Sequence, residues 1–178
     1  MTDNMPSKQN NVVLIGMIGV GKTAVGRQLA EQLNYDFIDL DAELESVCSL
    51  KLNEIYRRYG QIRFYAEEIL LLKKQIGSSR RVIAAGGALP PQQEHLRLWR
   101  QLGINIWLKA DPETILRRIR RKNNRLFFSP HATADEVKQE INNRAQQYET
   151  ISDYQVDLEQ ICLEEAVNKI ALFLQTQS

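Results

Sequence analysis

The residues best suited to chemistry form a glycine-rich segment near the amino end of the chain. Residues 16–23 read GMIGVGKT, which matches the phosphate-binding pattern G-x-x-x-x-G-K-S/T. Glycines let the backbone come close to phosphate oxygens, and the backbone N–H groups of such a loop supply positive potential. We expect Lys22 to reach the β- and γ-phosphates of a nucleotide, and Thr23 to hold Mg²⁺ through its hydroxyl group.

A second set of candidate groups is the pair Asp39 and Asp41, which ends the segment 35–39. At positions i and i+2 of an extended segment, two side chains point to the same side. At the mouth of a nucleotide site, one carboxylate can organise the water ligands of Mg²⁺ while the other meets the hydroxyl of an acceptor. The alternative is structural, because Asp41 precedes the helical pattern at 42–47 and could cap that helix.

The segments around these residues predict how they are held. The apolar run 12–15 predicts a buried strand before the glycine loop, and a helix is expected after it over 22–33. Strand, glycine turn and helix is the context in which the phosphate pattern works. Further strands are expected at 35–39, 82–85, 104–108 and 154–157. Further helices are expected at 41–47, 52–58, 62–76, 92–102, from 112 onward with Asp111 as its cap, 134–148 and 163–174.

This alternation of strands and helices predicts a three-layer α/β/α fold with a central five-stranded parallel sheet. Ligands of such sheets bind beyond the carboxyl ends of the strands, where the glycine loop, the two aspartates and the pair Gly86-Gly87 would meet. We expect a single domain over residues 1–178, with a flexible leader at 1–10 and a surface loop at about 121–132.

Composition and charge are those of an ordinary soluble globular protein. Hydrophobic residues make up 43% and charged residues 25%, and the net charge of +1 gives no global field toward nucleic acid or membrane. No apolar run approaches the about 20 residues of a membrane span. A basic run at 117–125 could bind nucleic acid, but it has no aromatic platform, and a lid over a triphosphate explains it more simply. Cys48 and Cys162 match no metal-binding spacing and are expected to be reduced thiols of a cytoplasmic protein.

Four motifs together resemble those of one enzyme family. The phosphate loop, D-x-D at 39–41, G-G at 86–87 and R-x-x-x-Y at 144–148 occur in the order found in shikimate kinases. The resemblance covers nearly the whole chain, from about 11 to 170. It implies a P-loop kinase fold like that of nucleoside monophosphate kinases, with a mobile lid over the loop at about 121–132. It also implies Mg²⁺-dependent transfer of the γ-phosphoryl group of ATP to a hydroxyl of shikimate.

The resemblance further implies roles for single residues, including an arginine over adenine, a lid arginine that reaches the phosphates and an arginine that binds the carboxylate of the acceptor. The implied catalytic groups are Lys22, Asp41 and Arg125. The implied contacts to ATP are Gly16, Gly19, Gly21, Lys22, Thr23, Ala24, Arg118 (over adenine) and Arg125 (in the lid). The implied metal site is Thr23 and, through water, Asp39. The implied acceptor contacts are Asp41, Tyr65, Gly86, Gly87 and Arg144 (to the carboxylate).

Two departures from the family pattern concern the expected acceptor contacts most directly. The pattern G-E-x-x-F-R-x-x-E has its counterpart at 60–68, where Tyr65 takes the place of a carboxylate-binding arginine. Arg63 lies close by, but two helical positions turn a side chain by about 200°, so it is no simple substitute. Ala88 replaces the third glycine of a turn and adds a methyl group where the backbone approaches the acceptor. Loss of a bidentate donor would cost about 2–3 kcal/mol of acceptor binding.

We therefore expect an ATP-dependent kinase acting on a small, hydroxylated, anionic metabolite, for which the resemblance implies shikimate. The altered acceptor half leaves open a kinase for another cyclic polyol or hydroxy acid. A third hypothesis is a nucleotide-binding homologue that has lost transfer, against which the intact Lys22, Thr23, Asp39 and Asp41 argue. A nucleoside monophosphate kinase would need a nucleobase pocket, for which the sequence gives no sign. We expect a monomer without nucleic-acid or membrane partners.

The histidines and tryptophans are expected to have no catalytic or ligand-binding role. His95 and His131 have no partners at metal-ligand spacing and are expected at the surface. Trp99 and Trp107 are expected to pack in the core rather than to stack on a ligand.

Overall fold

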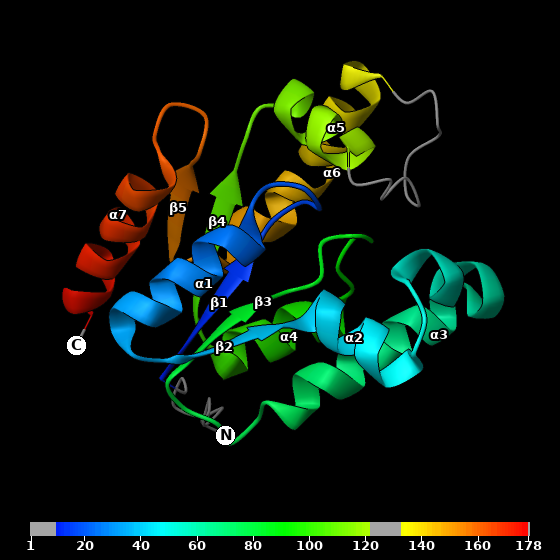
Figure 1. The fold of residues 1–178 in the computed structure, drawn as a ribbon, viewed down its shortest axis with the longest axis horizontal. Coiled ribbons are helices and arrows are strands. Elements are labelled where there is room, and N and C mark those ends of the chain that lie inside the picture. Colours follow the sequence, from blue (N-terminus) through cyan, green and yellow to red (C-terminus); the bar gives the residue numbers. More distant parts are fainter. Residues whose placement is uncertain (1–9, 122–132, 178) are drawn as a thin grey trace, which may run out of the picture.

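The computed structural model describes residues 10–121 and 133–177 of the chain. Within these ranges lie five strands and seven helices, arranged in three layers (Figure 1). The expected leader and the expected lid fall almost wholly outside the described residues, and so do Arg125 and His131.

All five strands are parallel and form one sheet in the order β2-β3-β1-β4-β5. The strands are β1 (Asn11–Ile15), β2 (Asp36–Asp39), β3 (Arg81–Ala84), β4 (Gly103–Lys109) and β5 (Tyr154–Asp157). The register places Val12 of β1 between Val82 of β3 and Ile104 of β4. The five-stranded parallel sheet expected from the sequence is thus confirmed.

Each face of the sheet has its own hydrophobic core, because successive residues of a strand point to opposite faces. Val12 and Leu14 of β1 belong to the cluster of the helices at 22–33 and 163–175. Val13 and Ile15 belong to the cluster of the remaining helices, and this alternation produces the three layers (Figure 1). The helices are α1 (Lys22–Leu33), α2 (Leu40–Cys48), α3 (Leu52–Lys74), α4 (Gln93–Leu102), α5 (Pro112–Arg121), α6 (Ala134–Ile151) and α7 (Leu163–Gln175).

Two helices show how local residues set the boundaries. α5 begins at Pro112 as expected, and the carboxylate of Asp111 accepts a hydrogen bond from the backbone N–H of Glu113 at 2.9 Å. α3 spans both segments that were expected as separate helices and bends at Gly60, whose φ of 73° is rare for other residues. None of the described helices is long and apolar enough to cross a lipid bilayer.

Candidate active site

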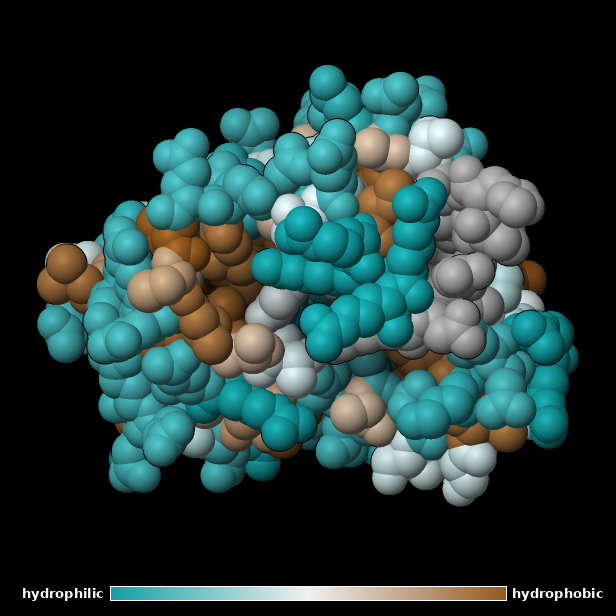
Figure 2. Space-filling model, turned by 45° about the horizontal axis from the view of Figure 1, so that its top comes forward, coloured by the Kyte–Doolittle hydropathy of each residue, from teal (hydrophilic) through white to brown (hydrophobic). Residues whose placement is uncertain are grey.

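A cavity of about 780 Å³ lies at the carboxyl ends of the strands. Its lining includes the phosphate loop, Asp39, Asp41 and Arg118. Figure 2 shows a hollow with hydrophobic surface around it and a hydrophilic patch beside it. Open parallel sheets bind ligands at this edge, and residues of the phosphate loop, Asp39 and Asp41 do border one cavity. Tyr65 and Gly86 line a separate small cavity, and Gly87 and Arg144 line neither.

The phosphate loop has a backbone that its glycines permit. Gly16 has a φ of 141°, and a Cβ atom there would lie 2.6 Å from the backbone oxygen of Leu108. α1 starts at Lys22, and its first residues line the cavity. The free N–H groups of a helix N-terminus favour an anion at this point.

The Lys22 side chain lies inside the phosphate loop and is only 7% exposed. Its Nζ donates hydrogen bonds to the backbone oxygens of Gly16 at 2.9 Å and of Met17 at 3.0 Å. Burial lowers the pKa of Lys22, while the carboxylates of Asp41 and Asp39 oppose that shift. The ammonium group therefore sits between the loop and the two aspartates.

The two aspartates are held in a way that the sequence did not indicate. Only Asp39 belongs to a strand, and Asp41 lies in the first turn of α2, so the argument from an extended segment is wrong. The alternative, in which Asp41 caps the helix, is also wrong because Asp39 is the cap. Its Oδ1 accepts hydrogen bonds from the backbone N–H groups of Asp41 at 3.2 Å and Ala42 at 3.3 Å. This cap fixes the turn, so both carboxylates still border the cavity.

Asp41 carries the most perturbed carboxyl group of the site. Its Oδ1 is shielded from solvent and accepts no hydrogen bond from the described residues. Burial raises the pKa of Asp41 to about 7, Lys22 opposes this shift, and Glu68 adds to it. A carboxyl group with this pKa exchanges its proton near neutrality, which suits a general base.

Thr23 and Asp39 form a pair of oxygen donors at the mouth of the phosphate loop. Thr23 Oγ1 donates to Asp39 Oδ2 at 2.7 Å. Such hard donors suit Mg²⁺, which is usually held by a few protein oxygens together with water and phosphate. In the part of the chain that the structure describes, no group of three or more His, Cys, Asp or Glu could hold a metal. The pair suits a Mg²⁺ ion whose other ligands are water and phosphate.

Arg118 of α5 contacts the phosphate loop and also lines the cavity. Its Nη1 donates to the backbone oxygen of Val20 at 2.7 Å. Leu158, Ile161 and Leu163 line the same cavity. A planar guanidinium beside aliphatic side chains is suited to a nucleobase, and the expected place of Arg118 over adenine stays a prediction. The aliphatic residues carried no signal in the sequence, because they look like ordinary core positions.

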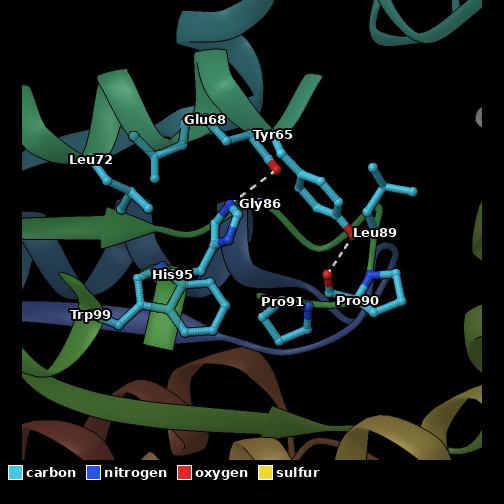
Figure 3. Close-up of a pocket in the computed structure, with 10 residues that line it drawn as sticks. Tyr65, Glu68, Leu72, Gly86, Leu89, Pro90, Pro91, His95 and Trp99 are labelled. Carbon is cyan, nitrogen blue, oxygen red and sulfur yellow. Dashed lines mark hydrogen bonds and ion pairs between the residues drawn. The ribbon is translucent and has the colours of Figure 1, made fainter. Parts of the chain in front are cut away.

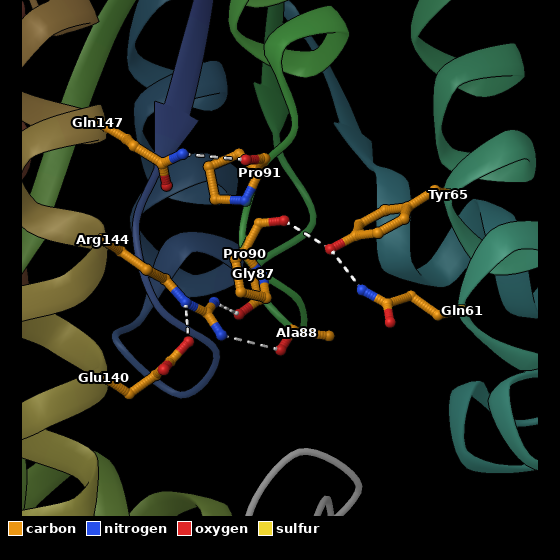
Figure 4. A network of polar contacts seen from close by, with 9 residues as sticks. All are labelled: Gln61, Tyr65, Gly87, Ala88, Pro90, Pro91, Glu140, Arg144 and Gln147. Carbon is orange, nitrogen blue, oxygen red and sulfur yellow. Dashed lines mark hydrogen bonds and ion pairs between the residues drawn. The ribbon is translucent and has the colours of Figure 1, made fainter.

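The segment 86–91, which we call the acceptor turn, connects β3 to α4 and is held by α6 (Figure 4). Arg144 of α6 is 2% exposed, and its Nη1 donates to the backbone oxygen of Gly87 at 3.0 Å. Its Nη2 lies 3.4 Å from the backbone oxygen of Ala88. The Gly87 oxygen also accepts from the backbone N–H of Ile18 at 3.0 Å. The acceptor turn thus joins α6 to the phosphate loop.

The two departures from the family pattern have different surroundings. Tyr65 is 6% exposed, and its hydroxyl donates to the backbone oxygen of Pro90 at 2.7 Å and accepts from Gln61 Nε2 at 3.2 Å. Figure 4 shows Tyr65 and Arg144 on opposite sides of the acceptor turn. Ala88 is fully buried in the hydrophobic core and does not line the cavity. Gly87 and Arg144 do not line that cavity either, so the expectation about the Ala88 methyl group stays a prediction.

The side chain of Arg63 points to solvent and not to the acceptor turn. Its side chain is 64% exposed and forms an ion pair with Glu67 on the next turn of α3. It lines neither the large cavity nor the small one beside Tyr65. In this structure Arg63 therefore does not take the place that an arginine at position 65 would have.

Sequence reasoning missed three residues near the acceptor turn. Glu140 accepts from Arg144 Nε at 2.6 Å, and its spacing of four residues along α6 was a usable signal. Glu68 is 7% exposed and contacts Gly86. His95 is 3% exposed, so the expectation of a surface position is wrong. Its spacing with the apolar residues 99 and 102 could have placed it on the buried face of α4.

The tryptophans behave as expected. Trp99 and Trp107 belong to the hydrophobic core and are 2% and 8% exposed. Both rings lie beside Tyr148, at centroid distances of 6.5 Å and 5.8 Å. They support α6, which carries Arg144, and this confirms their role in packing.

Comparisons with known proteins agree with this arrangement. The family model described as shikimate kinase matches residues 18–175. A shikimate kinase of Pelotomaculum thermopropionicum is 41% identical over 164 residues, which cover 92% of this chain and 95% of that relative. A shikimate kinase of Thermodesulfovibrio yellowstonii is 31% identical over 160 residues, with 90% and 92% covered. The solved structure of a shikimate kinase from Acinetobacter baumannii in complex with shikimate matches with a TM-score of 0.89 at 26% identity, covering 96% of this chain and 95% of that one.

Proposed function

Because this chain belongs to the shikimate kinase family, we propose that it transfers the γ-phosphoryl group of ATP to a hydroxyl group of shikimate. One observation supports this most directly, which is the position of Gly87 between the two halves of the site. Its backbone oxygen accepts from Arg144 Nη1 at 3.0 Å, and a Cβ atom there would overlap Lys22 Nζ. A cation for phosphate and a cation for carboxylate thus lie on two sides of one residue.

The donor half would act through positioning and charge. Lys22 and the N–H groups at the start of α1 would stabilise the charge of the transferring phosphoryl group. Thr23 and Asp39 would hold Mg²⁺, whose charge offsets that of the β- and γ-phosphates. Arg118 would lie against the adenine, and Arg125, outside the described residues, would reach the phosphates from the lid.

The acceptor half would aim one hydroxyl group at the terminal phosphorus. Asp41 would accept the proton of that hydroxyl as the oxygen–phosphorus bond forms and ADP leaves. Arg144, whose Nη1 and Nη2 each already donate one hydrogen bond to the acceptor turn, would bind the acceptor carboxylate through its remaining N–H groups. The backbone of Gly86 and Gly87 would lie along the acceptor ring. Tyr65 would shape the same site through the acceptor turn. We further propose that the protein works as a monomer in the cytoplasm, where ATP and Mg²⁺ are supplied.

A coupled assay of ADP release tests this proposal. With MgATP present, we expect ADP formation to depend on added shikimate and to yield one equivalent of a phosphate ester for each ADP. Omission of Mg²⁺ should remove the activity, since ATP would then lack its charge-neutralising ion. ADP release that does not respond to shikimate would contradict the proposal.

A second candidate is a kinase for a different cyclic hydroxy acid, and Tyr65 is the observation that favours it. The phenol puts a neutral hydroxyl group, already bonded to Pro90, where the family pattern has a second cation. An acceptor with less negative charge would lose less from this exchange. A panel of hydroxylated acids in the same assay separates the candidates, and a higher kcat/KM for another acid than for shikimate would favour the second.

A further inference from the structure

A buried carboxylate and a buried imidazole lie together behind the acceptor turn, outside the groups that the proposed function uses. Glu68 of α3 and His95 of α4 are 7% and 3% exposed. His95 Nε2 lies 3.5 Å from Glu68 Oε2. Figure 3 marks this contact with a dashed line. A carboxylate so far from water is costly unless a donor is directed at it.

The hydrogen bond on the other side of the ring determines where His95 carries its proton. The backbone N–H of Gln92 donates to His95 Nδ1 at 3.2 Å, so Nδ1 acts as an acceptor. In a neutral imidazole the single proton then resides on Nε2. Nε2 is buried and its contact with Glu68 Oε2 at 3.5 Å falls just short of a hydrogen bond, so Glu68 is the acceptor that its proton can reach by a small shift.

The surroundings leave the two side chains little freedom. The His95 ring packs edge-on against Tyr65 at 5.3 Å and against Trp99 at 6.2 Å between centroids. The cavity beside them has a volume of only about 10 Å³ and is lined by all four side chains. A space of this size holds about one water molecule, so Glu68 cannot swing far toward His95 or away from it.

The other carboxylate oxygen of Glu68, Oε1, lies against Gly86 of the acceptor turn. A Cβ atom on Gly86 would overlap Glu68 Oε1 and would lie 3.3 Å from Asp41 Oδ1. The carboxylate of Glu68 and that of Asp41 therefore contact the same point of the acceptor turn, one from α3 and one from α2. Any rotation of Glu68 would change the space at Gly86, where the acceptor ring is proposed to lie.

We propose that His95 is a positioning residue, whose Nε2–H holds the Glu68 carboxylate against Gly86 and thereby sets the affinity of the site for its acceptor. This inference rests on the proposed function, since it concerns the same acceptor site. Glu68 thereby has a donor directed at it, although the hydroxyl of Tyr65 donates to Pro90 instead. His95 does this from a different element, α4, and without adding a positive charge.

Two substitutions of His95 separate this role from a purely structural one. His95→Asn keeps an acceptor for the Gln92 N–H but removes the donor toward Glu68. His95→Gln places an amide N–H near the position of Nε2 and keeps that donor. We expect the acceptor KM to rise about tenfold in His95→Asn and to stay within about threefold of wild type in His95→Gln, with the KM for ATP unchanged in both. Melting temperatures report any general loss of structure.

The same measurements define what would overturn the proposal. If His95 only supports the fold, the asparagine variant will show a lower melting temperature and less active protein, with both KM values unchanged. An acceptor KM that rises equally in both variants would also contradict the proposal. As a control, Glu67→Gln alters a neighbouring carboxylate that is paired with Arg63 and should leave the acceptor KM unchanged.

A measurement without turnover distinguishes failure of this inference from failure of the proposed function. Nitrogen NMR of the histidine rings reports which nitrogen is protonated, and His131→Asn leaves His95 as the remaining histidine of the two in the chain. We expect the Nε2–H form, with a resonance that shifts in Glu68→Gln. A Nδ1–H form, or a resonance that ignores Glu68→Gln, would overturn the inference even if shikimate is phosphorylated.

Discussion

The donor half and the acceptor half of the site are built in opposite ways. The donor half uses consecutive residues, and Lys22 is bound by backbone oxygens of its own loop, at Gly16 and Met17. The acceptor half collects side chains from α2, α3 and α6 around one turn, and Arg144 reaches across 57 positions of the chain to Gly87. The donor half is formed by one local motif, whereas the acceptor half depends on the tertiary packing of distant segments.

This difference explains where the chain could depart from the family pattern. A change in the phosphate loop would alter a backbone that only glycine can adopt, as at Gly16. The exchange to Tyr65 keeps the acceptor turn in place, because its hydroxyl bonds to Pro90. We therefore expect changes in the donor half to lower kcat and changes in the acceptor half to alter the acceptor KM.

The largest effect is expected for Lys22→Ala in the donor half. Loss of the ammonium group removes a preorganised charge from the transferring phosphoryl group and should lower kcat by about 10³-fold. The coupled assay measures this, and circular dichroism shows whether the fold is retained. A kcat within tenfold of wild type would break the comparison, because the donor half would then not act through Lys22.

The next effect concerns Asp41, where the two halves meet. Its pKa is raised to about 7, so the base form is lost as the pH falls below that value. We expect kcat/KM to fall about tenfold for each pH unit below 7 and to level off above it. Asp41→Asn should lower kcat by about 10²-fold and abolish this pH dependence. A wild-type profile that is flat from pH 5 to 8 would contradict the role of Asp41.

A smaller effect is expected for Arg144→Lys in the acceptor half. Lysine keeps the charge but cannot offer paired planar donors, so the acceptor KM should rise about 30-fold. The KM for ATP should stay within about twofold, since the phosphate loop is intact. Equal increases in both KM values would show that Arg144 affects ATP binding as much as acceptor binding, against the proposed division into two halves.

The smallest effect is expected for a substitution that should improve acceptor binding rather than weaken it. Tyr65→Arg restores the donor of the family pattern beside Glu68, and we expect the acceptor KM for shikimate to fall about tenfold. Tyr65→Phe is the matched control, because it removes only the bond to Pro90 and should raise KM about threefold. An unchanged or raised KM in Tyr65→Arg would indicate that the acceptor half recognises shikimate by other means.

The sequence predicted the fold and the position of the phosphate loop in it, because both follow from local patterns. Alternating apolar runs gave the strands, and residues such as Asp111 and Pro112 gave helix starts. The phosphate loop carries its conformation in its own glycines. Residues 1–9 and 122–132 lie outside what the structure describes, so the expected leader and lid stay predictions.

The acceptor half was predicted less well, because its contacts join distant segments. Nothing near His95 in sequence indicates that it faces Glu68, and its burial depends on the packing of α4 against α3. The burial of Ala88 follows from the path of the acceptor turn, which one residue type does not reveal. The place of Asp41 was expected correctly for a wrong reason, since Asp39 caps α2 and carries it there.

Phosphorus NMR of the complete reaction tests the central claim most directly. With the protein, MgATP and shikimate together, the account predicts loss of the γ-phosphate signal and growth of one phosphate monoester signal equal to the ADP formed. Wild-type protein that leaves ATP unchanged, or that releases only inorganic phosphate, would contradict the claim that this site passes a phosphoryl group to the acceptor.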